Sequence, residues 1–372
     1  MKYYNWHKWY IFLLAAGLLT GCSADEPETP VKDGSQKEIK FQVSSATTTN
    51  ATRASIFDND DNLQDQNIRI DAYFHGLTTT FFSEALLRYR GFTNHFEFNT
   101  GPLNNWIQYY WPIEGAVLTS PSIENTSLDF VGYVPYILQS SDENVGTYAI
   151  PDYITLNAYS ASDGPSFSAA LPYTVGAEED NPATPYLDER MNRFNEEDQS
   201  TLQEFMYAYA TNMRSSTNNG TVDLEFKHPF ALVNIYLKSA KRGTVIDTVK
   251  ISGISTSGTY THSNNGWGSL GNPANLLKPV KKTVPSELNF NAPIGGPYLV
   301  IPQTLSGENN LTVNLTYNSS PEKKSATLST TWEPGKIYSY YLDFGTDTDA
   351  ILINVTIEEW VTHDYKTPID VK

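Results

Sequence analysis

The sequence predicts an all-β protein made of two antiparallel β-sandwich domains in tandem. Many short stretches alternate apolar and polar residues, the period of a half-buried strand. The chain has 24 Tyr and 17 Phe but only 4 Met and 1 Cys, and aromatic residues favour pleated, half-buried surfaces. About 350 residues follow a leader segment, which is more than one typical hydrophobic core, so two domains are expected.

The expected strands are separated by clusters of Gly, Pro, Asn and Ser, which is typical of sandwich sheets. In chain order their patterns cover residues 39–43, 68–74, 128–133, 205–208, 222–226, 233–237, 249–251, 311–317 and 351–357. Helical periodicity is scarce, and only residues 187–204, rich in Glu, Asp and Gln, could form a helical turn or two. No tandem repeat of fixed period is visible.

The predicted organisation has four parts. Residues 1–21 form a signal peptide, 22–36 a flexible tether, 37–218 an N-terminal sandwich domain and 219–372 a C-terminal sandwich domain. The domain junction falls in the uncharged polar stretch 215–220, because strong strand patterns lie on both sides of it.

The N-terminal segment has the features of a secretory signal. A basic start with Lys2 and Lys8 precedes an uncharged apolar run that is too short to span a bilayer comfortably. Residues 19–22, Leu-Thr-Gly-Cys, resemble a bacterial lipobox, which implies cleavage before Cys22 and acylation of that cysteine with chains such as palmitate. Two acyl chains would anchor the mature protein stably on a membrane. The alternative is an ordinary secretory signal with an incidental cysteine.

Charge and cysteine content restrict the classes of partner. Removal of Lys2 and Lys8 with the signal leaves 23 basic residues against 42 acidic ones, a net charge of −19. The negative electrostatic potential of such a protein repels nucleic acid and anionic lipid headgroups, so no nucleic-acid partner is expected. A single cysteine also allows no internal disulfide, so the core alone must stabilise the exported fold.

Several motifs, in order along the mature chain, resemble the fimbrillin family of type V pilus lipoproteins. They are Ala-Thr-Arg-Ala at 51–54, Tyr-Tyr-Trp-Pro at 109–112, Leu-Asp-Phe-Val-Gly-Tyr at 128–133, Phe-Met-Tyr-Ala at 205–208, Leu-Glu-Phe-Lys-His-Pro-Phe-Ala-Leu-Val at 224–233, and Trp-Glu-Pro-Gly-Lys-Ile-Tyr at 332–338. The resemblance implies transthyretin-like topology for both sandwiches. It also implies a structural and adhesive role in building a surface fibre, without enzymatic activity.

The same resemblance implies a route of assembly. An arginine-specific protease would cut between Arg53 and Ala54 and remove the first strand, whose apolar row is Ile39, Phe41 and Val43. A strand donated by another subunit would then complete the opened sheet, and such a head-to-tail contact builds a filament. The candidate donor strand is formed by Ile351, Ile353, Val355 and Ile357, with the tail at 367–371 as a second possibility.

Simpler interpretations stay open for the expected cut and for the two strands. Arg53 could be an ordinary loop arginine, and the two strands could complete their own domains permanently, as in a tip or anchor subunit. The expected partners are other fimbrial subunits in a homo- or heteropolymer, the protease, the outer membrane through the lipid, and a host or bacterial surface ligand. The expected location is the extracellular face of the outer membrane and the fimbrium.

The sequence indicates no catalytic, cofactor or metal site. The acidic stretch 58–62 is similar to a calcium loop but has Leu63 where the Gly belongs and Arg69 where the Glu belongs. His228 is interpreted as a buried core histidine. A rival function is a monomeric glycan-binding lipoprotein that uses the aromatic residues at 106–111 and Trp267, although packing in the core is the favoured interpretation of these rings.

Overall fold

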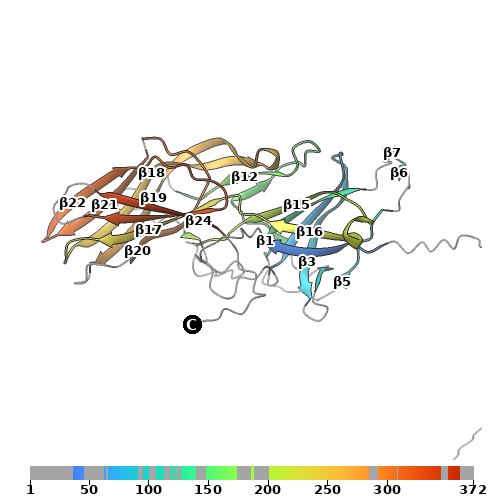
Figure 1. Ribbon diagram of the computed structural model, residues 1–372, viewed down its shortest axis with the longest axis horizontal. Helices are drawn as coiled ribbons and strands as arrows, with labels where there is room; N and C mark the ends of the chain where they lie inside the picture. The colour runs from blue at the N-terminus through green and yellow to red at the C-terminus, as the bar shows by residue number, and fades with distance from the viewer. Residues whose placement is uncertain are drawn as a thin grey trace, which may run out of the picture. The chain divides into compact units, whose positions relative to one another are not determined.

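The structure is a computed structural model of the whole chain. It describes residues 37–45, 63, 66–90, 95–99, 106–112, 118–119, 122–123, 127–139, 148–173, 186–187, 201–284, 292–307, 309–344 and 351–360. Strands dominate these residues, and the all-β tandem sandwich prediction is confirmed (Figure 1). No helix among them is long and apolar enough to cross a membrane.

The N-terminal sandwich is formed by one sheet of eight strands. Their order is β15-β8-β2-β3-β4-β1-β16, with β5 paired to β4. The bounds are β1 (Lys40–Ser45), β2 (Ile68–Phe74), β3 (Thr80–Arg90), β4 (His95–Asn99), β5 (Trp106–Ile107), β8 (Leu128–Val134), β15 (Met206–Met213) and β16 (Thr221–Phe226). β1 and β16 lie side by side in Figure 1 and run parallel.

This sheet curls back on itself and encloses a core. Tyr207 on β15 and Lys227, just after β16, exchange two backbone hydrogen bonds of 3.2 and 2.9 Å, which joins the two ends of the strand order. Phe41 on β1 packs across the interior on Phe130 of β8, with ring centroids 5.6 Å apart. Two layers of one sheet therefore face each other over a shared apolar interior.

The C-terminal sandwich is formed by two separate sheets. The six-stranded sheet has the order β11-β12-β18-β21-β22, with β19 paired to β18, and the four-stranded sheet has the order β20-β17-β23-β24. The bounds are β11 (Ile154–Leu156), β12 (Ser166–Ala170), β17 (Ala231–Ser239), β18 (Val245–Thr261), β19 (Gly266–Thr283), β20 (Ala292–Val300), β21 (Asn310–Tyr317), β22 (Ser320–Thr327), β23 (Lys336–Asp343) and β24 (Leu352–Glu359).

Short elements complete the described fold. Three pairs of two-residue strands are β6 (Leu118–Thr119) with β7 (Ser122–Ile123), β9 (Ile137–Leu138) with β10 (Tyr148–Ala149), and β13 (Tyr186–Leu187) with β14 (Thr201–Leu202). Two short 3-10 helices are η2 (Thr217–Gly220) and η3 (His262–Asn264). The helical turn expected at 187–204 falls mainly on residues outside the described ones, and at its described ends the chain forms β13 and β14.

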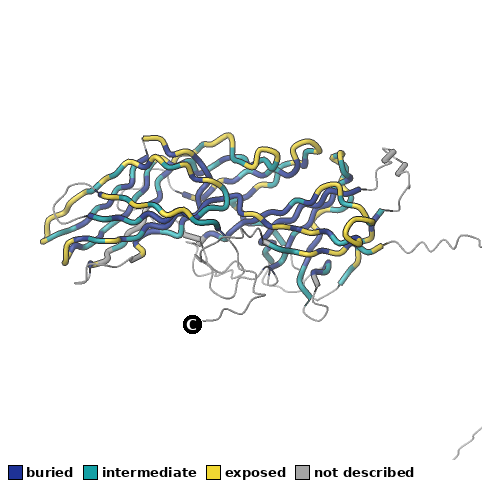
Figure 2. Tube along the Cα trace, viewed as in Figure 1, coloured by how far each residue is buried: buried dark blue, intermediate teal, exposed yellow. Residues whose placement is uncertain are grey.

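β8 is buried along its whole length because both of its faces are covered. Phe130 and Val134 belong to the N-terminal core, whereas Val131 and Tyr133 belong to the C-terminal core. A continuous apolar run is the sequence pattern of a strand buried on both faces. The edge strand β22 shows the opposite behaviour, and most of its residues are exposed (Figure 2).

Strands from each side of the expected domain boundary at residues 218 and 219 pair with strands from the other side. β11 and β12, from the N-terminal side, join the sheet of β18, whereas β16, from the C-terminal side, joins β1. The boundary itself stays a prediction. The crossing shows that each sandwich takes strands from both predicted segments.

Candidate functional site: the first strand, its groove and the C-terminal strand

β1 has backbone partners on both of its edges. It pairs in parallel with β16 through six residue pairs, from Lys40↔Thr221 to Ser45↔Phe226. On its other edge it pairs with β4, and the residues before it continue the ladder, since Ile39 N donates to Tyr109 O at 2.8 Å and Trp111 N to Lys37 O at 2.9 Å. Loss of this strand would therefore leave two sheet edges with unpaired backbone groups.

The side chains of β1 alternate between core and solvent as the sequence predicts. Ile39 and Phe41 are 3% and 5% exposed, Val43 is half-buried, and Lys40 and Gln42 are exposed. Phe41 packs edge-to-face on Phe98 at 5.3 Å as well as on Phe130. The groove under β1 is thus lined with aromatic rings and selects for an apolar side chain at every second position.

The two residues of the expected cut, Arg53 and Ala54, and the expected lipidation site, Cys22, lie outside the described residues. Cleavage and acylation stay predictions. Among the described residues, Arg214 and Arg242 are exposed in the loops after β15 and β17, so they are alternative sites for an arginine-specific protease.

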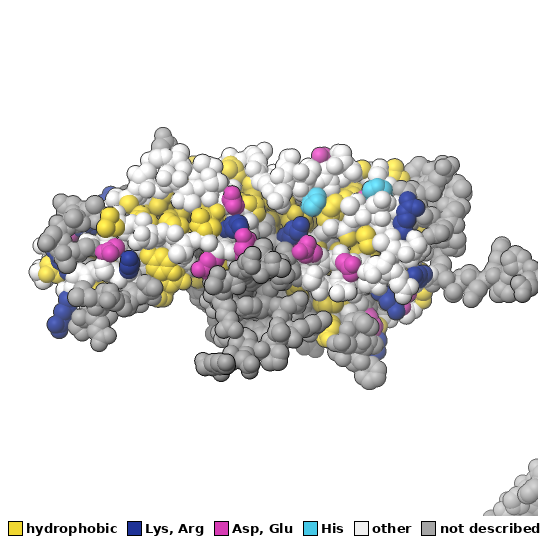
Figure 3. Space-filling view, in the orientation of Figure 1, with side chains coloured by type: hydrophobic (Ala, Val, Ile, Leu, Met, Phe, Trp, Pro, Cys, Tyr) yellow, Lys and Arg dark blue, Asp and Glu magenta, His cyan; other side chains and the backbone are white. Residues whose placement is uncertain are grey.

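The candidate donor strand is β24, which among the described strands pairs with β23 alone and so forms one edge of the four-stranded sheet. Ile351 is 7% exposed, and Ile353 and Val355 are half-buried against the C-terminal core. Ile357 is 56% exposed and Leu352 is 62% exposed, so neither contributes to the core. Apolar side chains accordingly lie at the surface along β24 (Figure 3).

The structure contains two buried polar clusters that were not predicted from the sequence. Asp129, on the buried strand β8, accepts hydrogen bonds from Thr211 Oγ1 at 2.7 Å, Asn212 N at 2.7 Å and Tyr159 OH at 2.7 Å, and contacts His75 Nδ1 at 2.9 Å. Burial by itself raises the pKa of Asp129, but these hydrogen bonds outweigh it and hold the pKa below the usual value.

The second cluster joins Glu204, His228 and Trp360. Glu204 is fully buried beside Nδ1 of His228, and the ring of His228 stacks on the indole of Trp360 with centroids 4.2 Å apart and planes 7° apart. Burial raises the pKa of Glu204, and the nearby histidine opposes this rise. His228 is therefore the buried core histidine that the sequence predicts. The residues around Glu204 in the sequence provide no indication that it is the acidic partner of this histidine.

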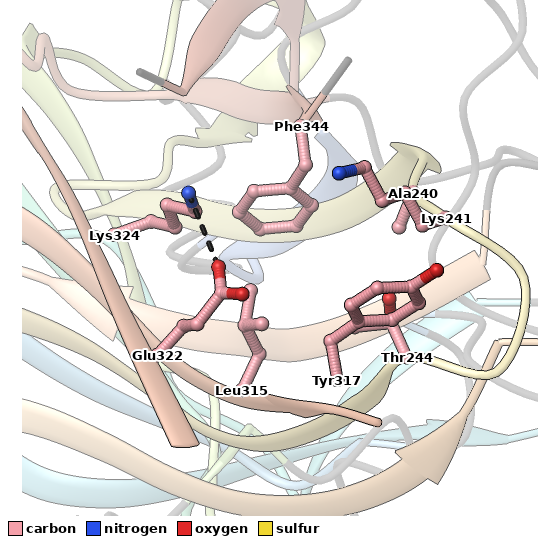
Figure 4. Close-up of a pocket in the computed structure, with 8 residues that line it drawn as sticks. All are labelled: Ala240, Lys241, Thr244, Leu315, Tyr317, Glu322, Lys324 and Phe344. Atoms are coloured by element: carbon pink, nitrogen blue, oxygen red, sulfur yellow. Dashed lines mark ion pairs between the residues drawn. The ribbon is translucent and has the colours of Figure 1, made fainter. Parts of the chain in front are cut away.

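A small cavity lies between the β21–β22 hairpin and the end of β23 (Figure 4). Lys324 and Glu322 form an ion pair at 3.3 Å on one side of the Phe344 ring, and Lys241 lies over the Tyr317 ring at 5.4 Å on the other. Its volume of about 40 Å³ can hold a few water molecules but not a sugar ring.

The three tryptophans considered for sugar stacking contact neighbouring groups of the fold, whereas Tyr110 is 40% exposed. Trp111 is 2% exposed and donates its indole N–H to Gly220 O at 3.1 Å. Trp267 donates to Pro229 O at 2.6 Å and packs against Phe230. The Trp106 ring is covered by the guanidinium of Arg90 at 5.0 Å. These three indole rings do not form an open, coplanar platform.

A family profile described as fimbrillin-like matches residues 159–360. The chain is similar to the crystal structure of a fimbrial protein from Bacteroides vulgatus, with 15% identity and a TM-score of 0.51 over 87% of this chain and 100% of the other; this likeness shows the fold. It also aligns with the C-terminally truncated tip fimbrial protein Mfa3 from Porphyromonas gingivalis, with 8% identity and a TM-score of 0.35 over 80% of this chain and 96% of the other. A comparison with curated proteins gives no match.

Proposed function

The chain belongs to the fimbrillin-like family, and on that premise we propose that it is a lipid-anchored precursor of a fimbrial subunit that polymerises by protease-triggered strand exchange. Membership of the family indicates a fimbrial subunit at the cell surface, with a structural rather than catalytic role. The proposal adds acylation of Cys22, insertion of the lipid in the outer membrane, and a cut between Arg53 and Ala54.

The double-sided pairing of β1 is the observation that carries this proposal. β1 comes before the expected cut in the sequence, so cleavage would free it from the covalent chain without breaking any later strand. Its departure would open the β16 edge and the β4 edge at once, above a groove lined by Phe98 and Phe130. A strand from another subunit could restore both ladders and fill the groove.

β24 is a suitable donor because it already has strand conformation and lies at the edge of its sheet, with side chains that are at most half-buried. No residue between Leu352 and Glu359 is fully buried. A donor that leaves one subunit and enters the next forms a heterologous contact, which does not close on itself and so produces a filament.

The test uses the chain from Ser23 onward, which lacks the acylated cysteine. An arginine-specific protease at limiting dose should release a single N-terminal fragment that ends at Arg53, and rods should then grow in electron micrographs. Arg53→Ala is the matched control and should give neither that fragment nor rods. Intact mass separates this cut from cuts at Arg214 and Arg242.

Addition of a synthetic peptide of residues 37–45 in trans extends the same test. The peptide should cap the opened groove and suppress growth of the rods, and a Phe41→Ala version should suppress it far less. A cut chain that stays monomeric would overturn the polymerisation proposal and favour an anchor, a tip or the monomeric glycan-binding alternative.

A further inference from the structure

β24 pairs with β23 along its whole length, but fully buried side chains lie only at its two ends. Ile351, just before it, is 7% exposed and Trp360, just after it, is 3% exposed, whereas the strand itself is half-buried or exposed throughout. Apart from this ladder, the strand depends on its end anchors to stay in place, because its middle contributes little burial.

The anchor at the Trp360 end brings together three distant parts of the chain. Glu204 lies before β15, His228 between β16 and β17, and Trp360 after β24. The parallel stack of the His228 ring and the Trp360 indole covers the buried contact between His228 Nδ1 and Glu204 Oε1. Removal of the indole would admit water to this buried pair and weaken it.

Backbone contacts lock the same point. Trp360 N donates to Gly335 O at 2.8 Å, and Gly335 N donates to Phe230 O at 2.8 Å, which ties the end of β24 to the start of β17. Next to it, Lys336 and Glu359 form an ion pair between β23 and β24. The C-terminal end of β24 thus has contacts in addition to the β23–β24 ladder.

The cluster also determines which residue can occupy this position. A slip of β24 by one residue along β23 would bring Glu359 to the place of Trp360, and a slip by two would bring Glu358 there. Either change would place a second carboxylate beside the buried Glu204 and remove the stacked ring. Only the observed register puts an aromatic ring on His228 and keeps Ile353 and Val355 toward the core.

We propose that Trp360, stacked on the His228–Glu204 pair, is a latch that fixes the register of β24 and retains it in its own sheet. Release of the latch frees β24 to leave its own sheet and to pair with a second copy of this chain in the groove that β1 vacates. The retention role stands on the geometry alone, and the role in pairing with a second copy rests on the function proposed above.

Hydrogen exchange measured by mass spectrometry on the uncut chain from Ser23 onward tests retention. Trp360→Ala should speed exchange in residues 352–359 at least tenfold and leave the β17–β20 ladder unchanged. Trp332→Ala is the matched control, because Trp332 is 1% exposed in the same sandwich and its indole donates to Tyr340 OH on β23 at 2.9 Å rather than to a residue of β24. The Trp332→Ala variant should speed hydrogen exchange across the whole sandwich, with no larger effect in β24 than elsewhere.

The conservative variant Trp360→Phe keeps an aromatic ring on His228 and should restore most of the protection of β24. Equal acceleration of β24 and of the β17–β20 ladder in Trp360→Ala would overturn the latch. So would unchanged exchange of β24 in that variant. Because no cleavage or assembly is involved, these results are independent of whether the cut chain polymerises.

A labelled peptide of residues 351–360, added in trans, tests whether the His228–Glu204 slot fixes the register of β24 through Trp360. The uncut Trp360→Ala chain should bind it, because its own strand leaves the slot empty, and the wild-type chain should not. The same peptide with Ala at its final position should bind at least tenfold more weakly. Equal binding of the two peptides would contradict the role of the slot in fixing the register of β24.

Discussion

Replacement of Phe41 by Ala should destabilise the N-terminal sandwich strongly. The side chain is 5% exposed and packs edge-to-face on Phe98 and Phe130 at 5.3 and 5.6 Å. A buried Phe→Ala change costs about 3–5 kcal/mol, and each aromatic contact of this kind is worth about 0.5–1.5 kcal/mol beyond its area. Because β1 is a short strand near the start of the fold, and the groove can partly collapse, we expect about 3–4 kcal/mol.

Urea unfolding of the chain from Ser23 onward measures this cost. Tryptophan emission is a suitable signal, since Trp111 packs on Phe130 in the same core at 5.7 Å. Gln42→Ala, at the next, exposed position of the strand, is the matched control and should lie within about 0.5 kcal/mol of wild type. Equal unfolding free energies for the two variants would refute the claim that β1 fills an apolar groove.

Two further predictions concern buried sites away from the groove. Asp129→Asn should cost about 2 kcal/mol at neutral pH, since hydrogen bonds to a charged group are lost or weakened. The pKa of Asp129 is lowered in the folded state, so its contribution to stability is present above the usual carboxyl pKa of about 4 and is lost as pH falls below that value. The difference in unfolding free energy between wild type and variant should therefore narrow as pH falls below about 4, and a constant difference would contradict this. Gly296→Ala should cost about 3 kcal/mol or more, because the new Cβ would lie 2.3 Å from Val233 O. Gly243→Ala has a similar positive φ but open space around the new Cβ, so urea midpoints should show only the backbone strain of about 1–2 kcal/mol, and equal costs would refute the steric explanation.

Local patterns in the sequence were sufficient for strands whose burial follows their own alternation. In β16, Val222, Leu224 and Phe226 are buried and the residues between them are not, as a period of two requires. The continuous apolar run of β8 likewise indicated a strand, and the structure adds the reason, since each face covers a different core.

Long-range partners could not be predicted in the same way. The placement of β12 beside β18 depends on which sheet offers a free edge, and no residue within Ser166–Ala170 encodes that choice locally. The pairing of Glu204 with His228 is similar, because each residue has an ordinary local context and acquires its role only when β15, β17 and β24 meet. From the sequence alone Asp129 is a polar interruption of an apolar strand, and its donors Thr211 and Asn212 come from the end of β15, far away in the chain.

The exchange of one strand for another is tested most directly by the backbone amides of β16. Their protection against hydrogen exchange should be high in the uncut chain, lost in a cut chain held monomeric by high dilution, and regained in the assembled rods. The account predicts this loss and recovery for residues 221–226, with the β17–β20 ladder unchanged throughout. Protection of β16 that persists in the cut monomer after β1 has left, or never returns on assembly, would contradict it.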